Sequence, residues 1–382
     1  MSLLTLNVGS SSLKAACYRQ GESQAVFVLD VDLATGAAQS CAGLPESRRQ
    51  WPPGLSAADI ALRLVSWLRE SGEHGLTACV HRVVHGGERD APVLINEGVL
   101  RALHRLAPLC PLHQPAALAV VDALRNSCPD LVQIAAFDTA FHAGQPSLWR
   151  EYALPAELRE RGVRGYGFHG LSCQSIMRRL RHDSAQLADG RVIIAHLGNG
   201  SSLTAVKGGR SQATTMGFSA LDGLPMGTRC GHLDPGVLLY LLEQDWTVEA
   251  LTRMLYRQSG LLGLSGISGD MRTLTASDAP EAAFAIDYYI DRVAREIAGL
   301  ATVLGGLDLL VFTGGIGEHQ PAVRACIVRR LAWMGLKLDE QANREGCVNI
   351  AVAESAASLL VIATDEQDEL RRAAEAVLLF GD

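Results

Sequence analysis

Two stretches of this sequence share one pattern and decide the fold. Residues 3–17 read LLTLNVGSSSLKAAC, and residues 191–206 read RVIIAHLGNGSSLTAV. In each, an apolar run, a small polar turn and a second apolar run follow one another, which is typical of a β-hairpin. The motif SSLxA occurs in both, at residues 11–15 and 201–205. A match this short can arise by chance, but the shared setting favours duplicated domains with a ligand between them.

Outside the hairpins, helical and strand patterns alternate along the chain. Residues 24–45 are expected to form a third strand and a loop. Strand patterns follow at residues 77–84, 132–137, 308–313 and 359–364, and helical patterns at residues 56–71, 115–126, 235–244, 247–257, 281–304, 321–334 and 366–379. This alternation predicts α/β sheets covered by helices.

Composition excludes several classes of protein. A chain of 382 residues is long enough for two domains. Its formal net charge of −7 argues against a protein built to bind nucleic acid. No apolar run is long enough to cross a membrane, and we expect no secretory signal. The nine cysteines form no CxxC pair, so we expect reduced thiols in the cytoplasm rather than zinc or disulfides.

Charged side chains stand at the ends of predicted strands. Arg82 lies inside an apolar strand and needs an anion or a carboxylate partner, so a structural ion pair and a ligand contact are both open. Asp138 ends the strand at 132–137, where α/β sheets place ligand contacts, although a turn or helix cap is equally open. Glu366 suits Mg²⁺ or simply a helix N-terminus. His81 and His85 would lie too far apart on a strand to share a metal, and we interpret them as polar strand residues.

Glycine-rich turns point to a phosphorylated ligand. We expect turns after strands at residues 9–12, 198–202 and 314–317, where backbone amides can hold phosphate. Arg229 stands in a further glycine-flanked loop. There is no GxxxxGK[ST] motif, and the GxGxxG at residues 165–170 follows no apolar strand, so a P-loop and a dinucleotide fold are excluded.

An ordered series of motifs runs along nearly the whole chain: residues 7–14 (NVGSSSLK), 81–87 (HRVVHGG), 137–142 (FDTAFH), 166–170 (YGFHG), 196–200 (HLGNG), 226–229 (MGTR), 268–272 (SGDMR), 312–318 (FTGGIGE) and 363–366 (ATDE). With this series the chain resembles the acetate kinase family. The resemblance implies a duplicated, ribonuclease H-like fold of the sugar kinase, heat-shock chaperone and actin type, with an active-site cleft between the domains. It also implies reversible transfer of phosphate from ATP to acetate, giving ADP and acetyl phosphate.

The resemblance further implies how the chain is organised. Residues 1–140 and 366–382 would form the N-terminal domain. Residues 141–365 would form a C-terminal domain for nucleotide binding and dimerisation. The family is homodimeric and cytoplasmic and uses Mg²⁺, with Mn²⁺ a possible substitute, and we expect neither nucleic-acid nor membrane partners.

Matching positions supply the catalytic roles that the resemblance implies. Arg82 and Arg229 match the two active-site arginines, which would hold the carboxylate and the transferring phosphoryl group. His169 matches the active-site histidine, and His113 a more peripheral one. Asp138 matches the catalytic aspartate, which would orient an arginine or a metal-bound water.

The remaining implied residues bind the metal and the two substrates. Asn7 and Glu366 match the magnesium side. The wall beside the acetate methyl group, next to Arg82, would be Val84, Leu112, Phe168 and Ala220. The nucleotide would contact Ser10, Ser12, Lys14, His196, Asn199, Gly200, Asp270, Met271, Arg272, Gly314, Gly315, Ile316 and Gly317.

Three departures from the family pattern leave alternatives open. Ala220 replaces a common proline, which leaves room for one more methylene and makes propionate kinase, or another short-chain acyl kinase, the nearest alternative. Cys173 and His232 replace a common histidine and aspartate near Arg229. An ATP hydrolase or a nucleotide-driven binding module of the same fold is a remote alternative, because neither needs two arginines around a small anion.

Overall fold

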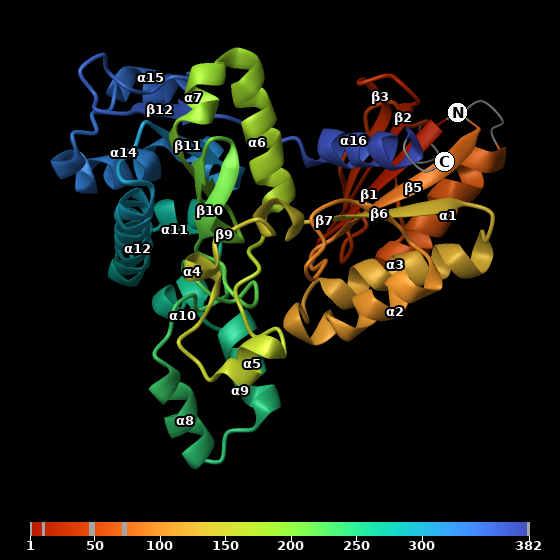
Figure 1. Ribbon diagram of the computed structural model, residues 1–382, viewed down its shortest axis with the longest axis horizontal. Coiled ribbons are helices and arrows are strands. Elements are labelled where there is room, and N and C mark those ends of the chain that lie inside the picture. The colour runs from red at the N-terminus through yellow and green to blue at the C-terminus, as the bar shows by residue number, and fades with distance from the viewer. Residues whose placement is uncertain (1, 10–11, 46–49, 71–74, 380–382) are drawn as a thin grey trace. The chain divides into compact units, whose positions relative to one another are not determined.

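The computed structural model describes residues 2–9, 12–45, 50–70 and 75–379. The chain divides into two compact units (Figure 1). The N-terminal unit comprises Met1–Ala143 and Asp365–Asp382, and the C-terminal unit comprises Gly144–Thr364. None of the helices in the described ranges is long and apolar enough to cross a membrane.

A seven-stranded sheet forms the centre of the N-terminal unit, in the order β4-β3-β2-β1-β5-β7-β6. The pairs β1–β2 and β2–β3 are antiparallel. The pairs β1–β5 and β5–β7 are parallel. The bounds are β1 Ser2–Val8, β2 Ser12–Arg19, β3 Ala25–Asp32, β4 Ala38–Ser40, β5 Leu76–Val83, β6 Val93–Leu94 and β7 Val132–Phe137.

Helices cover both faces of this sheet. Successive side chains of each strand point to opposite faces, so each face packs against its own helices. In β1, Leu4 and Leu6 pack in the core beneath α1 and α3, whereas Asn7 faces α16. The helices of this unit are α1 Ala57–Glu70, α2 Glu97–Arg105, α3 Gln114–Ser127 and α16 Glu366–Leu379, with 3-10 turns at Ala107–Leu109 and Ala140–His142.

A five-stranded sheet forms the centre of the C-terminal unit, in the order β10-β9-β8-β11-β12. Strands β8, β9 and β10 are antiparallel, and β11 and β12 run parallel to β8. The bounds are β8 Arg191–Leu197, β9 Ser201–Lys207, β10 Arg210–Thr214, β11 Leu309–Thr313 and β12 Ser358–Val361. The order and directions repeat those of β3-β2-β1-β5-β7. This shared topology confirms the duplicated α/β fold, and each SSLxA motif overlaps the start of its hairpin's second strand.

The long helix α12 carries much of the apolar core of the C-terminal unit. The helices here are α4 Ser147–Arg150, α5 Ala156–Glu160, α6 Gly170–Asp183, α7 Ala185–Asp189, α8 Pro235–Glu243, α9 Val248–Arg257, α10 Gly260–Ser265, α11 Met271–Thr275, α12 Pro280–Leu304, α13 Gly314–His319, α14 Pro321–Arg330 and α15 Glu340–Glu345, with a 3-10 turn at Ala332–Met334.

Three sequence expectations need correction. Residues 314–317 do not form a turn, because they begin the helix α13. Ser201 and Ser202 belong to β9 rather than to the preceding turn. His85 lies beyond the end of β5, and both His81 and His85 are buried. Each error has one cause: short polar and glycine-rich segments carry weak periodicity, so tertiary contacts decide their conformation.

Candidate active site

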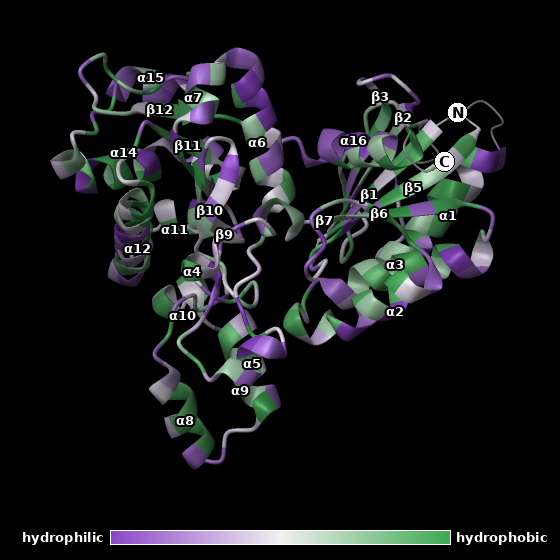
Figure 2. Ribbon diagram, in the orientation of Figure 1, coloured by the Kyte–Doolittle hydropathy of each residue, from purple (hydrophilic) through white to green (hydrophobic). Residues whose placement is uncertain are grey.

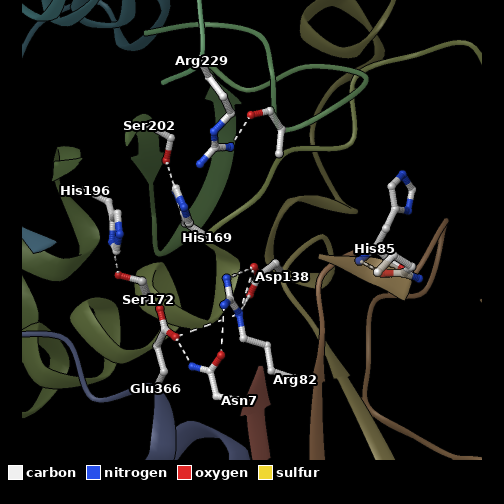
Figure 3. Close-up of polar contacts among 12 residues, drawn as sticks. Asn7, Arg82, His85, Asp138, His169, Ser172, His196, Ser202, Arg229 and Glu366 are labelled. Atoms are coloured by element: carbon white, nitrogen blue, oxygen red, sulfur yellow. Dashed lines mark hydrogen bonds and ion pairs between the residues drawn. The ribbon is translucent and has the colours of Figure 1, made fainter. Parts of the chain in front are cut away.

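Four polar residues of the N-terminal unit form one connected cluster (Figure 3). Arg82 donates from Nε to Oδ1 of Asp138 at 3.1 Å and from Nη2 to Oδ2 at 2.6 Å. Its Nη1 donates to Oδ1 of Asn7 at 3.0 Å. The Asn7 amide donates in turn to Glu366 Oε2 at 2.9 Å, and Glu366 lies 4.0 Å from Nε of Arg82.

Strand topology explains why these residues meet. Asn7 is near the carboxyl end of β1, Arg82 near that of β5, and Asp138 directly follows β7. These three strands are parallel neighbours, so their carboxyl ends share one edge of the sheet, where ligands bind in α/β proteins. Glu366 joins them as the first residue of α16.

The charge of Arg82 is held by its carboxylate partners. Burial lowers the pKa of the Arg82 guanidinium, but Asp138 and Glu366 raise that pKa by more, so the net shift is upward. The Asp138 side chain is 1% exposed, and both of its oxygens accept from Arg82. Asp138 therefore orients Arg82. The structural ion pair is present, and a substrate role for Arg82 stays a prediction.

The chemistry of Glu366 and Asn7 fits a magnesium ion. Mg²⁺ takes one or two carboxylates and keeps several waters. The Glu366 side chain is 17% exposed, whereas Arg82 already engages both oxygens of Asp138 and the side-chain oxygen of Asn7. Asn7 would therefore contact the ion through water. Within the described residues there is no cluster of three or more His, Cys, Asp or Glu able to hold a metal. A magnesium ion here would therefore depend on water and substrate phosphates for most of its ligands.

A second polar cluster lies in the C-terminal unit. The His169 ring stacks on the His196 ring, with centroids 4.2 Å apart. Nδ1 of His169 is hydrogen-bonded to Ser202 Oγ at 2.9 Å, and Nδ1 of His196 to Ser172 Oγ at 2.8 Å (Figure 3).

Arg229 approaches the same place as His169. A Cβ atom on Gly200 would lie 2.7 Å from Nη2 of Arg229 and 3.2 Å from Nε2 of His169. Only glycine leaves room here for both side chains. Arg229 is 8% exposed, and its Nη1 donates to the carbonyl of Ala220 at 2.5 Å. Two nitrogen donors thus converge over the backbone of the β8–β9 turn.

A pocket of about 550 Å³ lies in the C-terminal unit, next to this turn. Three segments of the chain line it, and six predicted nucleotide residues are among the lining residues: Asn199, Asp270, Met271, Arg272, Gly315 and Ile316. Gly198 and Gly269 also line it, and both lie inside quoted motifs. His319 and Gln320 follow the motif at residues 312–318, which was therefore drawn too short at its end.

The other predicted residues lie in varied surroundings. Lys14 forms an ion pair with Asp30 at 3.2 Å and is half exposed. Ser12 begins β2, and Ser10 lies outside the described residues. Val84 and Phe168 are buried, Leu112 is half-buried, and His113 directly precedes α3. Gly314 and Gly317 are buried in α13.

Two of the residues that depart from the family pattern, Cys173 and His232, differ in burial. Cys173 is buried on α6, and its Sγ contacts Thr204 Oγ1 at 3.5 Å. His232 is exposed, and its amide donates to the Gly223 carbonyl.

Comparison with known proteins decides the family. The model of the acetokinase family matches residues 2–371. The chain belongs to the acetokinase family. An acetate kinase of Rhodopseudomonas palustris (strain TIE-1) is 47% identical over 381 residues, covering 95% of each chain. This family is one of phosphotransferases, and the chain is a kinase of that kind.

Two solved structures share the whole architecture of the acetokinase chain. A propionate kinase from Francisella tularensis superposes with a TM-score of 0.88 at 36% identity, covering 97% of this chain and 98% of the other. An acetate kinase from Entamoeba histolytica superposes with a TM-score of 0.87 at 30% identity, covering 100% of both. The likeness to a propionate kinase keeps the propionate alternative open.

Proposed function

We propose that this chain transfers the γ-phosphoryl group of ATP to acetate, reversibly, giving acetyl phosphate and ADP. The observation that carries the proposal is the end-to-end match, at 47% identity, to a protein named acetate kinase. The convergence of Arg229 and His169 over Gly200 supports it, because donors fixed around one point suit a phosphoryl group in transfer.

The N-terminal cluster suits the acetate side of the reaction. Acetate is already an anionic nucleophile, so the reaction needs no strong base. It needs positive charge to bring two anions together. Arg82, held rigidly by Asp138, supplies that charge in a guanidinium geometry that matches a carboxylate. We assign Val84, Leu112, Phe168 and Ala220 to the wall around the methyl group.

The C-terminal residues suit the nucleotide side. We assign the transferring phosphoryl group to Arg229 and Nε2 of His169. The 550 Å³ pocket is large enough for a nucleoside, and we assign the adenosine to it. The amides of Gly198–Gly200 and of the first turn of α13 then face the phosphates.

Magnesium completes the proposal on the N-terminal side. We assign the ion to Glu366, directly or through water, and to Asn7 through water. When bound, it neutralises phosphate charge during transfer. In its absence the Asn7 amide and the Arg82 guanidinium already hold Glu366 in place.

Trapping of the product tests the proposed function. The purified protein is incubated with Mg-ATP and acetate, and acyl phosphate is captured by hydroxylamine as the hydroxamate. We expect hydroxamate that requires acetate, ATP and Mg²⁺ together. Phosphate release without any carboxylate, and no hydroxamate, would instead indicate an ATP hydrolase.

Propionate is the second candidate substrate. It is favoured by Ala220, a small buried residue, and by the structural likeness to a propionate kinase. One methylene changes discrimination by about 1–3 kcal/mol. We expect Ala220→Pro to raise the ratio of kcat/KM for acetate over propionate by about tenfold. An unchanged ratio would remove Ala220 from the acetate wall.

We further propose that the active protein is a cytoplasmic homodimer. The helix α8 is almost wholly apolar between its ends and buries none of its residues (Figure 2). Leu239 is 64% exposed and Tyr240 is 60% exposed. An apolar patch of this kind marks an interaction surface, and a second copy of the chain is the partner we assign to it. None of the nine cysteines, all within the described ranges, forms a disulfide, which is compatible with a reducing compartment.

A further inference from the structure

Two histidines and two serines of the C-terminal unit form a network in which the two imidazole rings stack and each ring is hydrogen-bonded to one serine. His169 is the N-cap residue of α6, and Ser172 lies in the first turn of that helix. His196 and Ser202 are direct cross-strand partners on β8 and β9. Each histidine bonds the serine of the other element: His169 bonds Ser202, and His196 bonds Ser172 (Figure 3).

Ring stacking connects the two hydrogen-bonded pairs. The two imidazole planes are 24° apart, with their centroids separated by 4.2 Å. The His169 ring is therefore fixed at its edge by Ser202 and on its face by His196. The His196 ring is fixed in turn by Ser172, which is fully buried. Loss of Ser172 or His196 would free the His169 ring without touching its own hydrogen bond.

The backbone of His169 shows that the chain holds this ring under constraint. His169 adopts a left-handed conformation with φ of 58°. The only other non-glycine residue with positive φ in the described ranges is Asp245. Such conformations are disfavoured for residues with a Cβ atom and gather at functional sites. Here the conformation leaves Nε2 facing the point that Arg229 also approaches.

We propose that His196 and Ser172 are positioning residues, which fix the ring of His169 and act on the reaction only through it. The inference rests on the proposed phosphoryl transfer. It gives His196 a role other than the nucleotide contact that the family resemblance implies. The His169 ring is hydrogen-bonded to Ser202 through Nδ1, and its Nε2 faces the point that Arg229 also approaches.

A double-mutant cycle tests the proposal. His196→Gln and His169→Gln are compared singly and together in acyl phosphate formation. We expect His196→Gln to lower kcat by about 10- to 100-fold, with KM for ATP and acetate changed less than twofold. In the His169→Gln background, His196→Gln should have no further effect. His182→Gln, an exposed histidine on the same helix, is the matched control.

Two outcomes would overturn the inference. Additive losses in the cycle would show that His196 acts independently of His169. A raised KM for ATP with unchanged kcat would assign His196 to the nucleotide. Where His196→Gln fails to fold, Ser172→Ala and His196→Phe carry the same test. His196→Phe keeps the stacking surface, so it should retain more activity than His196→Gln.

Nitrogen chemical shifts give a readout that does not depend on the substrate. In ¹⁵N NMR of the intact protein, His169 should show one tautomer. In Ser172→Ala we expect the His196 shifts to change, because Nδ1 of His196 loses its hydrogen bond to Ser172, and the His169 signals to broaden, because the stacked ring is less firmly held. An unchanged pattern with unchanged kcat would contradict the proposal. An inactive wild-type protein with the expected His169 shifts would place the failure in the proposed function instead.

Discussion

At the scale of single residues, Gly200 determines whether two nitrogen donors can meet. Arg229 and His169 both approach the space that a side chain at this position would fill. The site therefore requires a residue without a Cβ atom at position 200.

Gly200→Ala is expected to abolish activity with little effect on folding. The added methyl group would lie 2.7 Å from Nη2 of Arg229, which must move. Displacing one donor from a developing charge costs about 100- to 1,000-fold in kcat. Gly299→Ala is the matched control, since that helical position has open space and the change should stabilise α12 by about 1 kcal/mol. Full activity in Gly200→Ala would remove the convergence from the mechanism.

Parts of the site follow from the sequence, and parts do not. Arg82 was predicted inside one strand and Asp138 at the end of another, and parallel pairing brings the two together. The site role of Asn7 came only from the family resemblance. Glu366 is distant in the sequence, and only the family resemblance attached it to Asn7. The hydrogen bond between His196 and Ser172 depends on how α6 packs against the β8–β9 hairpin, and no local sequence pattern predicts that packing.

At the scale of elements, the helix α13 is the clearest difference between sequence and structure. Its glycines predicted a turn, yet Gly314–His319 is helical and begins immediately after β11. Glu318 stabilises this start, because its Oε1 accepts from the amide of Gly314 at 2.8 Å. The helix contributes Gly315, Ile316 and His319 to the pocket.

Arg324 holds this helix in place from α14. The Arg324 side chain is almost fully buried, and its guanidinium donates to the carbonyls of Gly317 and Glu318 and to Asn343. Hydrogen bonds from a charged group contribute about 1.5–3 kcal/mol each. The pocket wall therefore depends on a residue that does not line it.

Arg324→Met is expected to weaken nucleotide binding and stability together. The buried carbonyls at the end of α13 would lose their donor, which costs about 1–3 kcal/mol for each unsatisfied group. Calorimetric titration with ADP should give a Kd raised by at least tenfold, and the melting temperature should fall. Arg329→Met, an exposed change on the same helix, is the control. Unchanged ADP affinity would show that α13 keeps its position without Arg324.

At the scale of the whole molecule, the exposed apolar surface of α8 predicts self-association. We expect Leu239→Glu combined with Tyr240→Glu to convert a dimer into a monomer, because two charges would have to be buried in the interface. Sedimentation equilibrium measures the mass directly. Trp333→Glu is the control. It changes an exposed apolar residue outside α8 and should leave the dimer intact. A monomeric wild-type protein would contradict the assignment of α8.

Buried histidines make stability depend on pH. Burial lowers the pKa of His81 and of His85 to about 4. Both are therefore neutral in the folded protein and become protonated on unfolding below pH 6.5. Their contribution is complete above pH 6.5 and is lost as the pH falls towards 4. At about 1.4 kcal/mol per pKa unit, each contributes on the order of 3 kcal/mol.

Urea unfolding between pH 7.5 and pH 4.5 measures this effect. We expect the free energy of unfolding to fall through this range and to fall less steeply in His81→Gln. The exposed variant His182→Gln should follow the wild-type curve. Identical slopes in wild type and His81→Gln would show that folding does not lower the pKa of His81.

The most direct test of the account follows oxygen atoms through the reaction. The protein is incubated with Mg-ATP and acetate labelled with ¹⁸O in both oxygens, and the products are observed by ³¹P NMR. Attack of acetate on the γ-phosphorus predicts acetyl phosphate whose phosphorus carries one ¹⁸O, seen as an isotope shift. Unlabelled inorganic phosphate as the sole product would contradict the account, because water would then be the acceptor.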